Sequence, residues 1–215
     1  MLHLIIAMTL FLSPTDPILN EESYPVCPCD IACEEIQEII DTMYEIAYGE
    51  TKDRSKAVMV GLAAPQIGIQ KRIILVDLAA TGIFTEETQP PPPKIKEFIN
   101  PEILWQSDEK EIWREGCYST GRVCGLVPRS KNVLIRSYDR DGNISTQEFT
   151  GYTARIFQHE IDHLDGIRFP DRIDNDDDLH WVEPNEISQY RISWATWEKK
   201  YPRKTWDGMK HGNAH

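Results

Sequence analysis

Two segments of the chain carry apolar residues at helical spacing. In residues 30–47, apolar side chains recur every three or four positions and acidic residues fill the gaps, which predicts a surface helix packed on a core. Asp30 is expected to cap this helix, and Gly49 is expected to follow its end. In residues 151–164, one face is apolar and the opposite face carries two histidines. Because both faces are in use, we expect this second helix to lie inside the protein.

Shorter apolar runs predict β-strands. Residues 71–78, built around Ile-Ile-Leu-Val, are expected to form a buried strand, and residues 98–105 and 111–115 are further strand candidates. Residues 132–138 and 144–149 flank the sequence Asp-Arg-Asp-Gly-Asn. An Asp-Gly pair tolerates the positive φ angle of a tight turn, so these two runs predict a β-hairpin.

The remaining segments lack such periodicity or lie near the ends of the chain. Residues 1–12 are apolar but have neither a basic start nor a cleavage site, so we expect a structural strand rather than a targeting segment. Residues 79–94 contain four consecutive prolines and predict an exposed loop. Residues 174–178 are acidic and predict a solvated turn. Residues 184–200 predict a third helix, and the last dozen residues are expected to be loose.

The composition is that of an ordinary globular chain. It has 215 residues, of which 40% are hydrophobic and 27% charged, which excludes a disordered, collagen-like or multi-span membrane protein. The formal net charge of -12 disfavours a protein that reads nucleic-acid sequence. Residues 187–215 differ from the rest, because they contain six basic residues and only two acidic ones. The cysteines number five, and an odd number predicts reduced thiols in the cytoplasm rather than a disulfide framework.

The strongest chemical signal is Gln-His-Glu-Ile-Asp-His at residues 158–163. His159 and His163 stand one helical turn apart, with about 6 Å between their Cβ atoms, so both imidazoles can bind one metal ion. Glu160 can act as a general acid and base on a water activated by that metal. The alternative is a pair of core or surface histidines, which this spacing around a Glu disfavours in a chain with 6 His.

A catalytic metal site needs a third protein ligand and an open position. Phe169 stands where a metzincin peptidase has its third histidine, so that class is excluded. Glu183 or Glu186 would complete a gluzincin-like peptidase site, although they follow the acidic run without a helical frame. The other candidate is Cys117, which follows a glycine between strand-like segments, although a lone cysteine is more often a small buried apolar residue.

Two further segments carry weaker signals. Residues 61–66 are small residues that end in Gln66, and this glutamine can donate its amide N–H to a developing oxyanion, although the segment also fits a simple turn. The other is a cysteine cluster without the second half of a metal motif, which predicts reduced thiols: Cys27, Cys29 and Cys33.

Taken in order, these segments resemble the peptide deformylase family. That family combines a G-x-G-x-A-A-x-Q segment, an E-G-C-x-S segment and a Q-H-E-x-D-H helix, which stand here at residues 59–66, 115–119 and 158–163. The resemblance covers about residues 11–172, and residues 16–26 are similar to the opening strand of the family. It implies an α+β fold, with antiparallel strands around a central metal-binding helix, an N-terminal outer helix and a C-terminal helix.

The resemblance also has departures. Met59 replaces the first glycine of its segment, and Tyr118 replaces the usual leucine after the cysteine, which is expected to make the neighbouring pocket more polar. Thr120 and Gly121 stand where the family commonly has an apolar residue and a proline, and the proline-rich loop resembles an insertion.

The resemblance assigns roles to named residues. The metal ligands it implies are Cys117, His159 and His163. The ion is usually Fe²⁺ in the family, and Zn²⁺, Ni²⁺ or Co²⁺ can occupy the site; a thiolate with two imidazoles suits such ions. Glu160 is implied as the proton carrier, and Gln66 and the backbone N–H of Tyr118 as donors to the oxyanion.

Five other residues have supporting roles in this comparison. Glu115 and Arg129 are expected to form an ion pair that holds the cysteine loop. Substrate backbone is expected to lie beside Val60, Gly61 and Gly116, as an added strand.

The implied reaction is hydrolysis of the N-formyl group of newly made formylmethionyl polypeptides, with release of formate. We expect a cytoplasmic enzyme without membrane contact, a catalytic domain at residues 1–172, and an acidic linker with a basic extension at 173–215. The extension carries tryptophans among its lysines, which suits ribosome contact through RNA as well as simple packing on the domain. The three tryptophans concerned are Trp194, Trp197 and Trp206.

Overall fold

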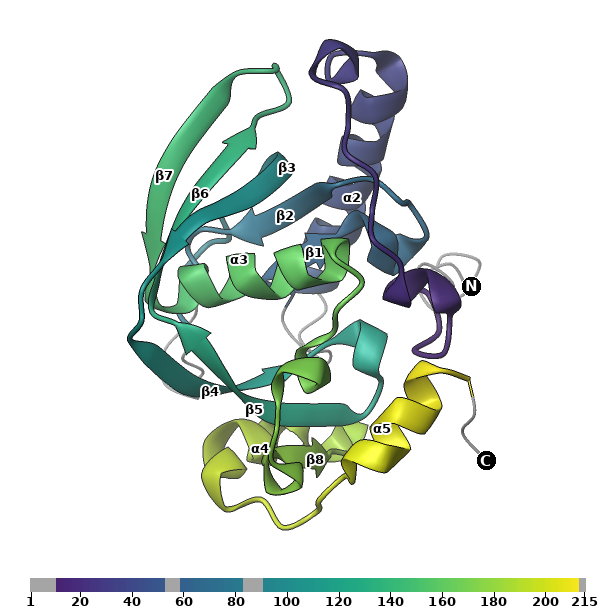
Figure 1. Ribbon diagram of the computed structural model, residues 1–215, viewed down its shortest axis with the longest axis vertical. Coiled ribbons are helices and arrows are strands. Elements are labelled where there is room, and N and C mark those ends of the chain that lie inside the picture. The colour runs from purple at the N-terminus through teal and green to yellow at the C-terminus, as the bar shows by residue number, and fades with distance from the viewer. Residues whose placement is uncertain (1–10, 53–58, 83–90, 213–215) are drawn as a thin grey trace.

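The computed structural model describes residues 11–52, 59–82 and 91–212, and its strands surround one central helix (Figure 1). A five-stranded antiparallel sheet has the order β1-β2-β3-β6-β7, and a three-stranded antiparallel sheet has the order β4-β5-β8. The strands are β1 Gly61–Ala63, β2 Ile73–Asp77, β3 Ile95–Gln106, β4 Lys110–Gly116, β5 Val123–Ser130, β6 Asn132–Tyr138, β7 Ile144–Thr150 and β8 Leu179–Trp181. This arrangement confirms the predicted α+β fold.

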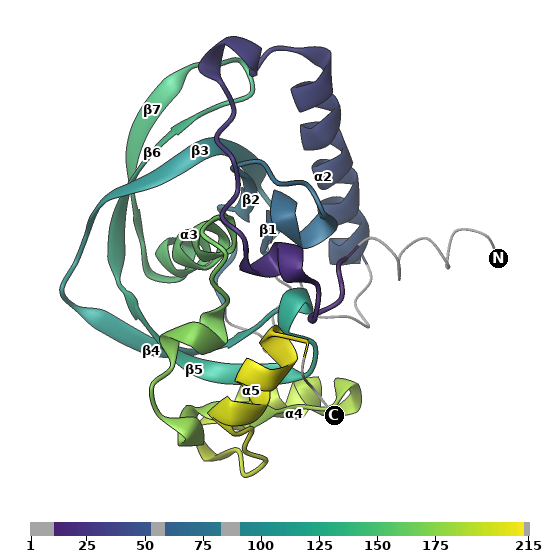
Figure 2. The ribbon, with the colours of Figure 1, turned by 45° about the vertical axis from the view of Figure 1, so that its right-hand side comes forward.

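The central helix is α3, Gly151–Leu164, which touches strands of both sheets. Figure 2 shows it nearly end-on, with the strands curving around it. A second long helix, α2, Glu34–Lys52, lies outside the larger sheet. The bounds of α3 agree with the sequence prediction, and the strand predictions are confirmed within a few residues.

Strand β2 shows why the core consists of two layers. All of its residues are buried, because helices cover both faces of the sheet at this point. Ile73 and Leu75 pack in the cluster that contains the apolar face of α2. Ile74 and Val76 pack in the cluster that contains the apolar face of α3. Alternate side chains of a strand point to opposite faces, so a strand with helices on both sides is apolar throughout.

The end of α3 is fixed by Gly166, which adopts a φ angle of 68°. The N–H of Ile167 donates to the carbonyl of Asp162 at 2.8 Å, a bond typical of a helix that ends in a left-handed residue. A Cβ atom at Gly166 would lie 2.6 Å from the backbone oxygen of Asn20. The glycine therefore lets the N-terminal segment pass close to α3 and sets the position of the helix.

The predicted hairpin is confirmed as β6 and β7. Their register runs from Asn132 opposite Thr150 to Tyr138 opposite Ile144. In the turn, the Asp139 carboxylate accepts hydrogen bonds from two backbone N–H groups further along the chain.

Helix α2 begins and ends later than predicted. Asp30 lies in a short 3-10 helix, η2, Pro28–Asp30, so its prediction as the cap of α2 was wrong. Pro28 fixes the backbone for this separate turn, and α2 starts only at Glu34. Gly49 lies within α2 rather than after it, because the buried face of the helix continues beyond it to Glu50.

The C-terminal region also differs from the prediction. The expected helix at residues 184–200 is broken into η7 Pro184–Glu186, α4 Ile187–Ser193 and η8 Trp194–Thr196. The last residues are not loose up to residue 210, because α5, Arg203–Lys210, inserts Trp206 into the core. Trp206 is fully buried and its indole N–H donates to the Asp171 carboxylate at 2.8 Å. Trp206, together with Met209 and the ion pair between Lys210 and Asp171, thus holds a segment that was expected to be loose.

Two N-terminal expectations change as well. Instead of an opening strand, residues 17–20 form the 3-10 helix η1, Pro17–Asn20, because the Asp16 carboxylate accepts the Ile18 N–H at 3.0 Å and caps it. Most of the strand expected at residues 1–12 lies outside the described residues, which begin at residue 11. The centre of the proline-rich loop, residues 83–90, also lies outside them. The remaining 3-10 helices are η3 Ala64–Ile67, η4 Tyr118–Thr120, η5 Phe169–Arg172 and η6 Asp176–Asp178.

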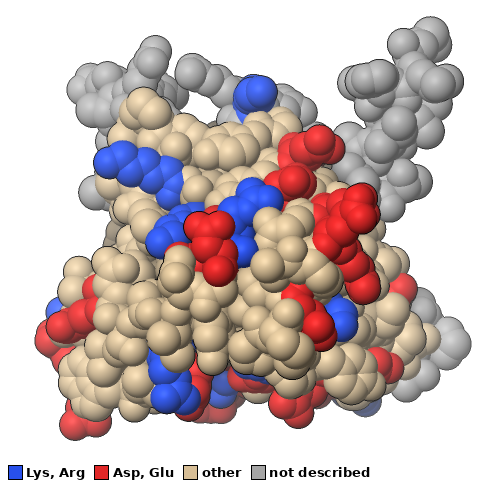
Figure 3. Space-filling model, turned by 90° about the horizontal axis from the view of Figure 1, so that it is seen from above, with Lys and Arg blue, Asp and Glu red and all other residues tan. Residues whose placement is uncertain are grey.

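The surface over the start of α2 and the β6–β7 hairpin carries charges of both signs (Figure 3). Arg140 and Asp41 form one such pair there, at 2.9 Å. The net negative charge therefore does not form one continuous acidic patch on this face.

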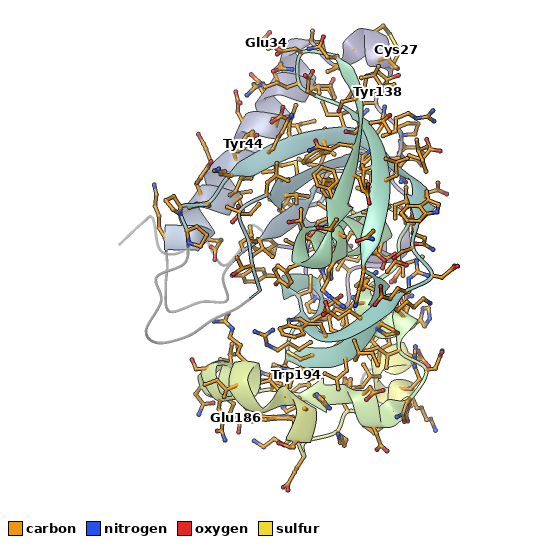
Figure 4. The ribbon with its side chains drawn as sticks, turned by 90° about the vertical axis from the view of Figure 1, so that its left-hand side faces the viewer. Cys27, Glu34, Tyr44, Tyr138, Glu186 and Trp194 are labelled. Carbon is orange, nitrogen blue, oxygen red and sulfur yellow. A yellow bond between two sulfur atoms is a disulfide. The ribbon has the colours of Figure 1, made fainter. Side chains whose placement is uncertain are left out.

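Cys27 and Cys29 form a disulfide, contrary to the expected reduced thiols. The turn at Pro28 brings their Cα atoms to 5.3 Å, within the range that a disulfide requires. Figure 4 places Cys27 at the end of the molecule opposite to Glu186 and Trp194. Cys33 is free and exposed.

Candidate metal centre

Three candidate ligands meet where the end of β4 faces α3. The ligand atoms of Cys117, His159 and His163 all lie within 4.8 Å of one another. Cys117 follows β4, and its Sγ lies 3.3 Å from Nε2 of His163. The two histidines stand on one face of α3, as their spacing predicts. The fold thus brings a thiol to two imidazoles that lie about 40 residues further along the chain.

His159 is oriented by Glu115. Its Nδ1 lies 2.8 Å from Oε2 of Glu115, so this nitrogen donates to the carboxylate and Nε2 is left for a metal ion. Burial disfavours the charged ring, but hydrogen bonds to Cys117 and Glu115 raise the pKa of His159 well above its ordinary value. A metal ion that binds Nε2 has to displace the proton held there, so metal binding at this ring depends on pH.

Glu115 lies at the centre of a buried ionic network. Arg129 donates to both of its oxygens, at 2.9 and 3.0 Å, and Arg155 donates to Oε1 at 2.7 Å. Burial alone would raise the pKa of this carboxyl, but Arg129 and His159 hold it well below its usual range. The ion pair expected between Glu115 and Arg129 is therefore present, and it is bidentate.

The environment of the second histidine, His163, disfavours its charged form. Burial, reinforced by the neighbouring His159, lowers the pKa of His163 well below its ordinary value. An imidazole must be unprotonated to bind a metal ion, so this environment suits a ligand. The adjacent Asp162 accepts hydrogen bonds from Arg129 at 2.5 Å and Arg172 at 2.6 Å, which ties α3 to β5 and η5.

Glu160 differs from its neighbours because it lacks a full set of partners. Its Oε2 atom is buried and has no hydrogen-bond partner within the described part of the chain. Burial raises the pKa of Glu160 to about 7, so this carboxyl can both accept and donate a proton near neutral pH. A Cβ at Gly61 would lie 2.3 Å from Oε1 of Glu160, so only glycine lets β1 approach the carboxyl this closely.

Gln66 is held with its amide N–H₂ toward the site. Its Oε1 accepts the Ala63 N–H at 2.8 Å, and its Nε2 lies 3.2 Å from both Cys117 Sγ and Ser119 Oγ. The 3-10 helix η3 begins after Ala63, so Gln66 emerges from a rigid turn directly after β1. The amide is thus positioned beside the ligand cysteine.

A cavity of about 380 Å³ opens onto these groups. The residues expected to bind substrate all line it: Val60, Gly61 and Gly116. Tyr118 also lines it, but its hydroxyl donates to Glu50 of α2 at 3.1 Å and its ring stacks on Phe11.

The alternative peptidase ligands are not brought to the histidines. Glu183 pairs with Arg122 at 2.8 Å, and Glu186 pairs with Lys199. Neither glutamate belongs to the group of ligand atoms around His159 and His163. The structure therefore favours Cys117 as the third ligand.

Several functional neighbours were missed by the sequence analysis. Arg155 precedes His159 by one helical turn, and this i, i+4 spacing was the available signal for a shared carboxylate partner. Ser119 ends the E-G-C-x-S segment, which was the available signal for it, whereas the C-terminal residues that line the cavity gave no signal, because only the folded chain brings them there.

The fold and site define a metal-dependent hydrolase. One thiolate and two imidazoles form a ligand set for Fe²⁺, Zn²⁺, Ni²⁺ or Co²⁺. The buried oxygen of Glu160 beside it, which lacks a partner in the part of the chain that the structure describes, suits a proton carrier. None of the described helices is long and apolar enough to cross a membrane.

Comparison with known proteins identifies the family. The family model described as polypeptide deformylase matches residues 8–178. A peptide deformylase of Bartonella tribocorum is 42% identical over 158 residues, which cover 74% of this chain and 80% of the relative. One of Thermotoga neapolitana is 37% identical over 159 residues, covering 74% and 82%.

Solved structures agree. A peptide deformylase from Thermotoga maritima superposes with a TM-score of 0.62 at 33% identity, covering 77% of this chain and 97% of that one. A class I type b peptide deformylase from Acinetobacter baumannii, with Met-Ala-Ser bound, gives 0.63 at 32% identity, covering 74% and 93%. The chain therefore belongs to the peptide deformylase family. The predicted enzyme class and activity are confirmed: removal of the formyl group from an N-terminal methionine.

Proposed function

We propose that the residues around the cavity divide the deformylation reaction as the resemblance implies. The observation that carries this proposal is the convergence of three ligand atoms within 4.8 Å, next to a buried carboxyl with one oxygen that has no partner among the described residues. Cys117, His159 and His163 hold the ion, which we propose to be Fe²⁺. When bound, that ion polarises the formyl carbonyl and acidifies a water molecule.

Glu160 is the proton carrier in this scheme. Its carboxylate accepts a proton from the attacking water and then delivers it to the amine that leaves, so water is added across the formyl C–N bond. The products are formate and a free amino terminus. The pKa of about 7 suits both transfers, because the group is ionised in part and protonated in part near neutral pH.

Gln66 and the backbone N–H of Tyr118 stabilise the negative charge that develops on the carbonyl oxygen. Gln66 Nε2 already points to the ligand cysteine, and the hydrogen bond from Ala63 to its Oε1 prevents the amide from turning over. Donors that are fixed before the reaction need no reorganisation as the charge develops.

The edge of the larger sheet provides a place for the peptide. β1 pairs with β2 on one side and is the last strand of its sheet. An extended substrate beside Val60 and Gly61 adds a strand there, with Gly116 across the cavity. The Acinetobacter baumannii relative was solved with the tripeptide Met-Ala-Ser bound, which is a deformylated product in form.

For the whole chain, we propose a catalytic domain at residues 1–172 with an extension at 173–215, acting on nascent formylmethionyl chains in the cytoplasm. The family match, which ends at residue 178, supports this division. Trp197 and Trp206 are buried, which supports a packing role for these two residues. Contact with the ribosome would then involve exposed lysines such as Lys204. Loss of salt-sensitive co-sedimentation with ribosomes in a Lys204→Glu variant would support that contact, and unchanged co-sedimentation would contradict it.

The test of the proposed function is a formate-release assay on a formyl-Met-Ala-Ser peptide, with protein purified anaerobically. We expect turnover that a chelator abolishes and Fe²⁺ restores. A protein that carries metal at stoichiometry yet releases no formate would refute the proposal.

A further inference from the structure

Arg168 is a fully buried arginine outside the proposed set of reacting residues. It follows α3, and its guanidinium donates to three oxygen atoms. Nη1 donates to the backbone carbonyls of Pro14 at 2.6 Å and Ser119 at 2.9 Å, and Nη2 donates to the side-chain oxygen of Asn20 at 2.9 Å. A guanidinium remains charged in proteins, so these acceptors replace the water that it loses on burial. The N-terminal segment and the turn after the ligand cysteine are thereby tied to one side chain.

The Ser119 carbonyl is part of the turn that presents the Tyr118 N–H. This turn is η4, which directly follows the ligand Cys117. The peptide unit that contains the Ser119 carbonyl also contains the Thr120 N–H, which donates to the Cys117 carbonyl at 3.1 Å. That carbonyl in turn belongs to the same peptide unit as the Tyr118 N–H. Because each peptide unit is planar, Arg168 restrains the orientation of the Tyr118 N–H through two consecutive hydrogen bonds.

The same turn also contacts the other proposed donor to the oxyanion. Ser119 is buried, and its Oγ lies 3.2 Å from Nε2 of Gln66. This amide nitrogen lies equally close to the Cys117 thiol. A shift of the turn therefore moves both donors relative to the ligand cysteine, and Arg168 is connected to both by a chain of short contacts.

The position of the guanidinium also depends on α5, which lies beyond the segment that matches the family. The Trp206 ring lies against Arg168, with 4.6 Å between the ring centroid and Cζ. Asp171 accepts hydrogen bonds from the Trp206 indole and the Lys210 ammonium. It also accepts the backbone N–H of Arg168 at 3.0 Å. Figure 2 shows α5 beside the N-terminal segment and the η4 turn. The family match ends at residue 178, so the family motifs do not specify this support.

We propose that Arg168 is a positioning residue for deformylation, held in place by α5 and acting through the turn that carries the Tyr118 N–H. This inference rests on the proposed function, because it concerns the oxyanion donors of the same site. Arg168 is buried and does not line the cavity, so it acts on the turn rather than on the substrate. Donors that are fixed in advance stabilise the charge that develops in the transition state, so a looser turn slows the reaction more than it weakens substrate binding.

The test measures deformylation of formyl-Met-Ala-Ser by metal-loaded Arg168→Met and Arg168→Lys variants. Arg168→Met removes all three side-chain hydrogen bonds and should lower kcat by roughly tenfold or more, with KM within about twofold of wild type. Arg168→Lys retains the charge but not the planar fork, so its kcat should lie between those of Arg168→Met and wild type. A role limited to stability lowers the free energy of unfolding without this split between kcat and KM.

A double variant tests the contribution of α5. Trp206→Leu removes the ring that lies against the guanidinium and should also lower kcat without raising KM. In an Arg168→Met background, Trp206→Leu should have little further effect on kcat, because its influence passes through the guanidinium. Equal effects of Trp206→Leu in both backgrounds overturn the link through α5.

Two controls separate positioning from stability and from charge. Ile40→Ala removes buried side-chain volume on α2, and Arg136→Gln removes a positive charge from an exposed residue of β6. Both variants should keep the kcat and KM of wild type. Every variant is assayed at a temperature where thermal melts show it to be folded, and its rate is divided by its measured metal content.

The outcomes are distinct. A kcat of Arg168→Met within about threefold of wild type, or a fall in kcat that only follows a loss of metal, overturns the proposal. An equal fall in Ile40→Ala also overturns it. If Arg168→Met does not fold, Arg168→Lys and Trp206→Leu decide, and kcat values equal to wild type in both refute the positioning role. Metal-loaded wild-type protein that releases no formate refutes the proposed function itself, whereas formate release that is insensitive to Arg168 refutes this inference alone.

Discussion

Helices α2 and α3 have similar apolar periodicity, yet they are buried in different ways. On α2 the buried side chains are apolar apart from Glu50, and the remaining faces are exposed or half-exposed. On α3 nearly the whole surface is buried, including five polar or charged side chains: Arg155, Gln158, Glu160, Asp162 and His163. Helix α2 covers the core with an apolar face, whereas α3 places polar and charged side chains inside the protein.

The buried polar side chains of α3 differ in their hydrogen-bond partners, and this separates residues with a structural role from the residue that reacts. Burying a polar group costs free energy unless a hydrogen bond replaces its water. Gln158 bonds the backbone of Ser130, and Asp162 bonds two arginines. Glu160 retains a buried oxygen without a partner among the described residues. A fold tolerates such a cost where function requires it, which supports Glu160 as the reacting group.

The largest effect is expected when a metal ligand is removed, either His163 on α3 or Cys117, which faces α3 from the end of β4. Cys117→Ala and His163→Ala should each abolish stoichiometric metal binding and formate release. A metal that binds only the folded state at 100 to 1,000 times its dissociation constant contributes roughly 3–4 kcal/mol, so the free energy of unfolding should fall by about that amount. Metal analysis and thermal melts with and without chelator measure this. Retention of one ion per chain in both variants would contradict the ligand assignment.

The next largest effect concerns Glu160. Glu160→Gln should keep the metal and the fold but lower kcat by about 10²–10⁴, because the proton carrier is lost. The matched control on the other helix is Glu38→Gln, an exposed residue of α2, which should leave kcat unchanged. A Glu160→Gln enzyme within tenfold of wild type would show that another group carries the proton.

A substitution in the buried face of α2 should change the free energy of unfolding but not the catalytic rate. Ile40 is fully buried against the sheet, so Ile40→Ala should lower the free energy of unfolding by about 2–5 kcal/mol. Denaturant titration gives this value. At a temperature where the variant is folded, its metal content and kcat should match wild type, and a loss of kcat there would show that α2 shapes the site.

The contrast also explains what the sequence could predict. The bounds of α3 and the metal-ligand spacing follow from local rules, since i, i+4 neighbours share a helix face wherever the helix lies. β2, β3, β4 and the hairpin follow from apolar runs and an Asp-Gly turn, whereas β1, β5 and β8 were not predicted. Arg155 as a partner of Glu115 depends on β4 lying beside α3, so its role appears only in three dimensions.

The C-terminal region was mispredicted for the same reason. α5 is short, and its position depends on Trp206 and Met209 reaching a core formed by β5 and η5. Likewise, nothing local to residues 184–191 indicates that they line a cavity whose other residues stand much earlier in the chain, from Val60 to Glu160. Local patterns predict elements, whereas contacts between distant segments decide which of them become part of the site.

The smallest expected effect tests the end of α2, where the sequence was misleading. A glycine after an amphipathic segment usually marks a helix end, because it accepts the left-handed conformation. Gly49 instead has helical neighbours on both sides, is exposed, and has open space where a Cβ atom would lie. Gly49→Ala should therefore stabilise the protein by about 0.5–1 kcal/mol, because alanine loses less backbone entropy in a helix. A thermal melt should show a rise of about 1–4 °C. If the melting temperature falls instead, Gly49 ends the helix in solution and α2 is shorter by its last turn.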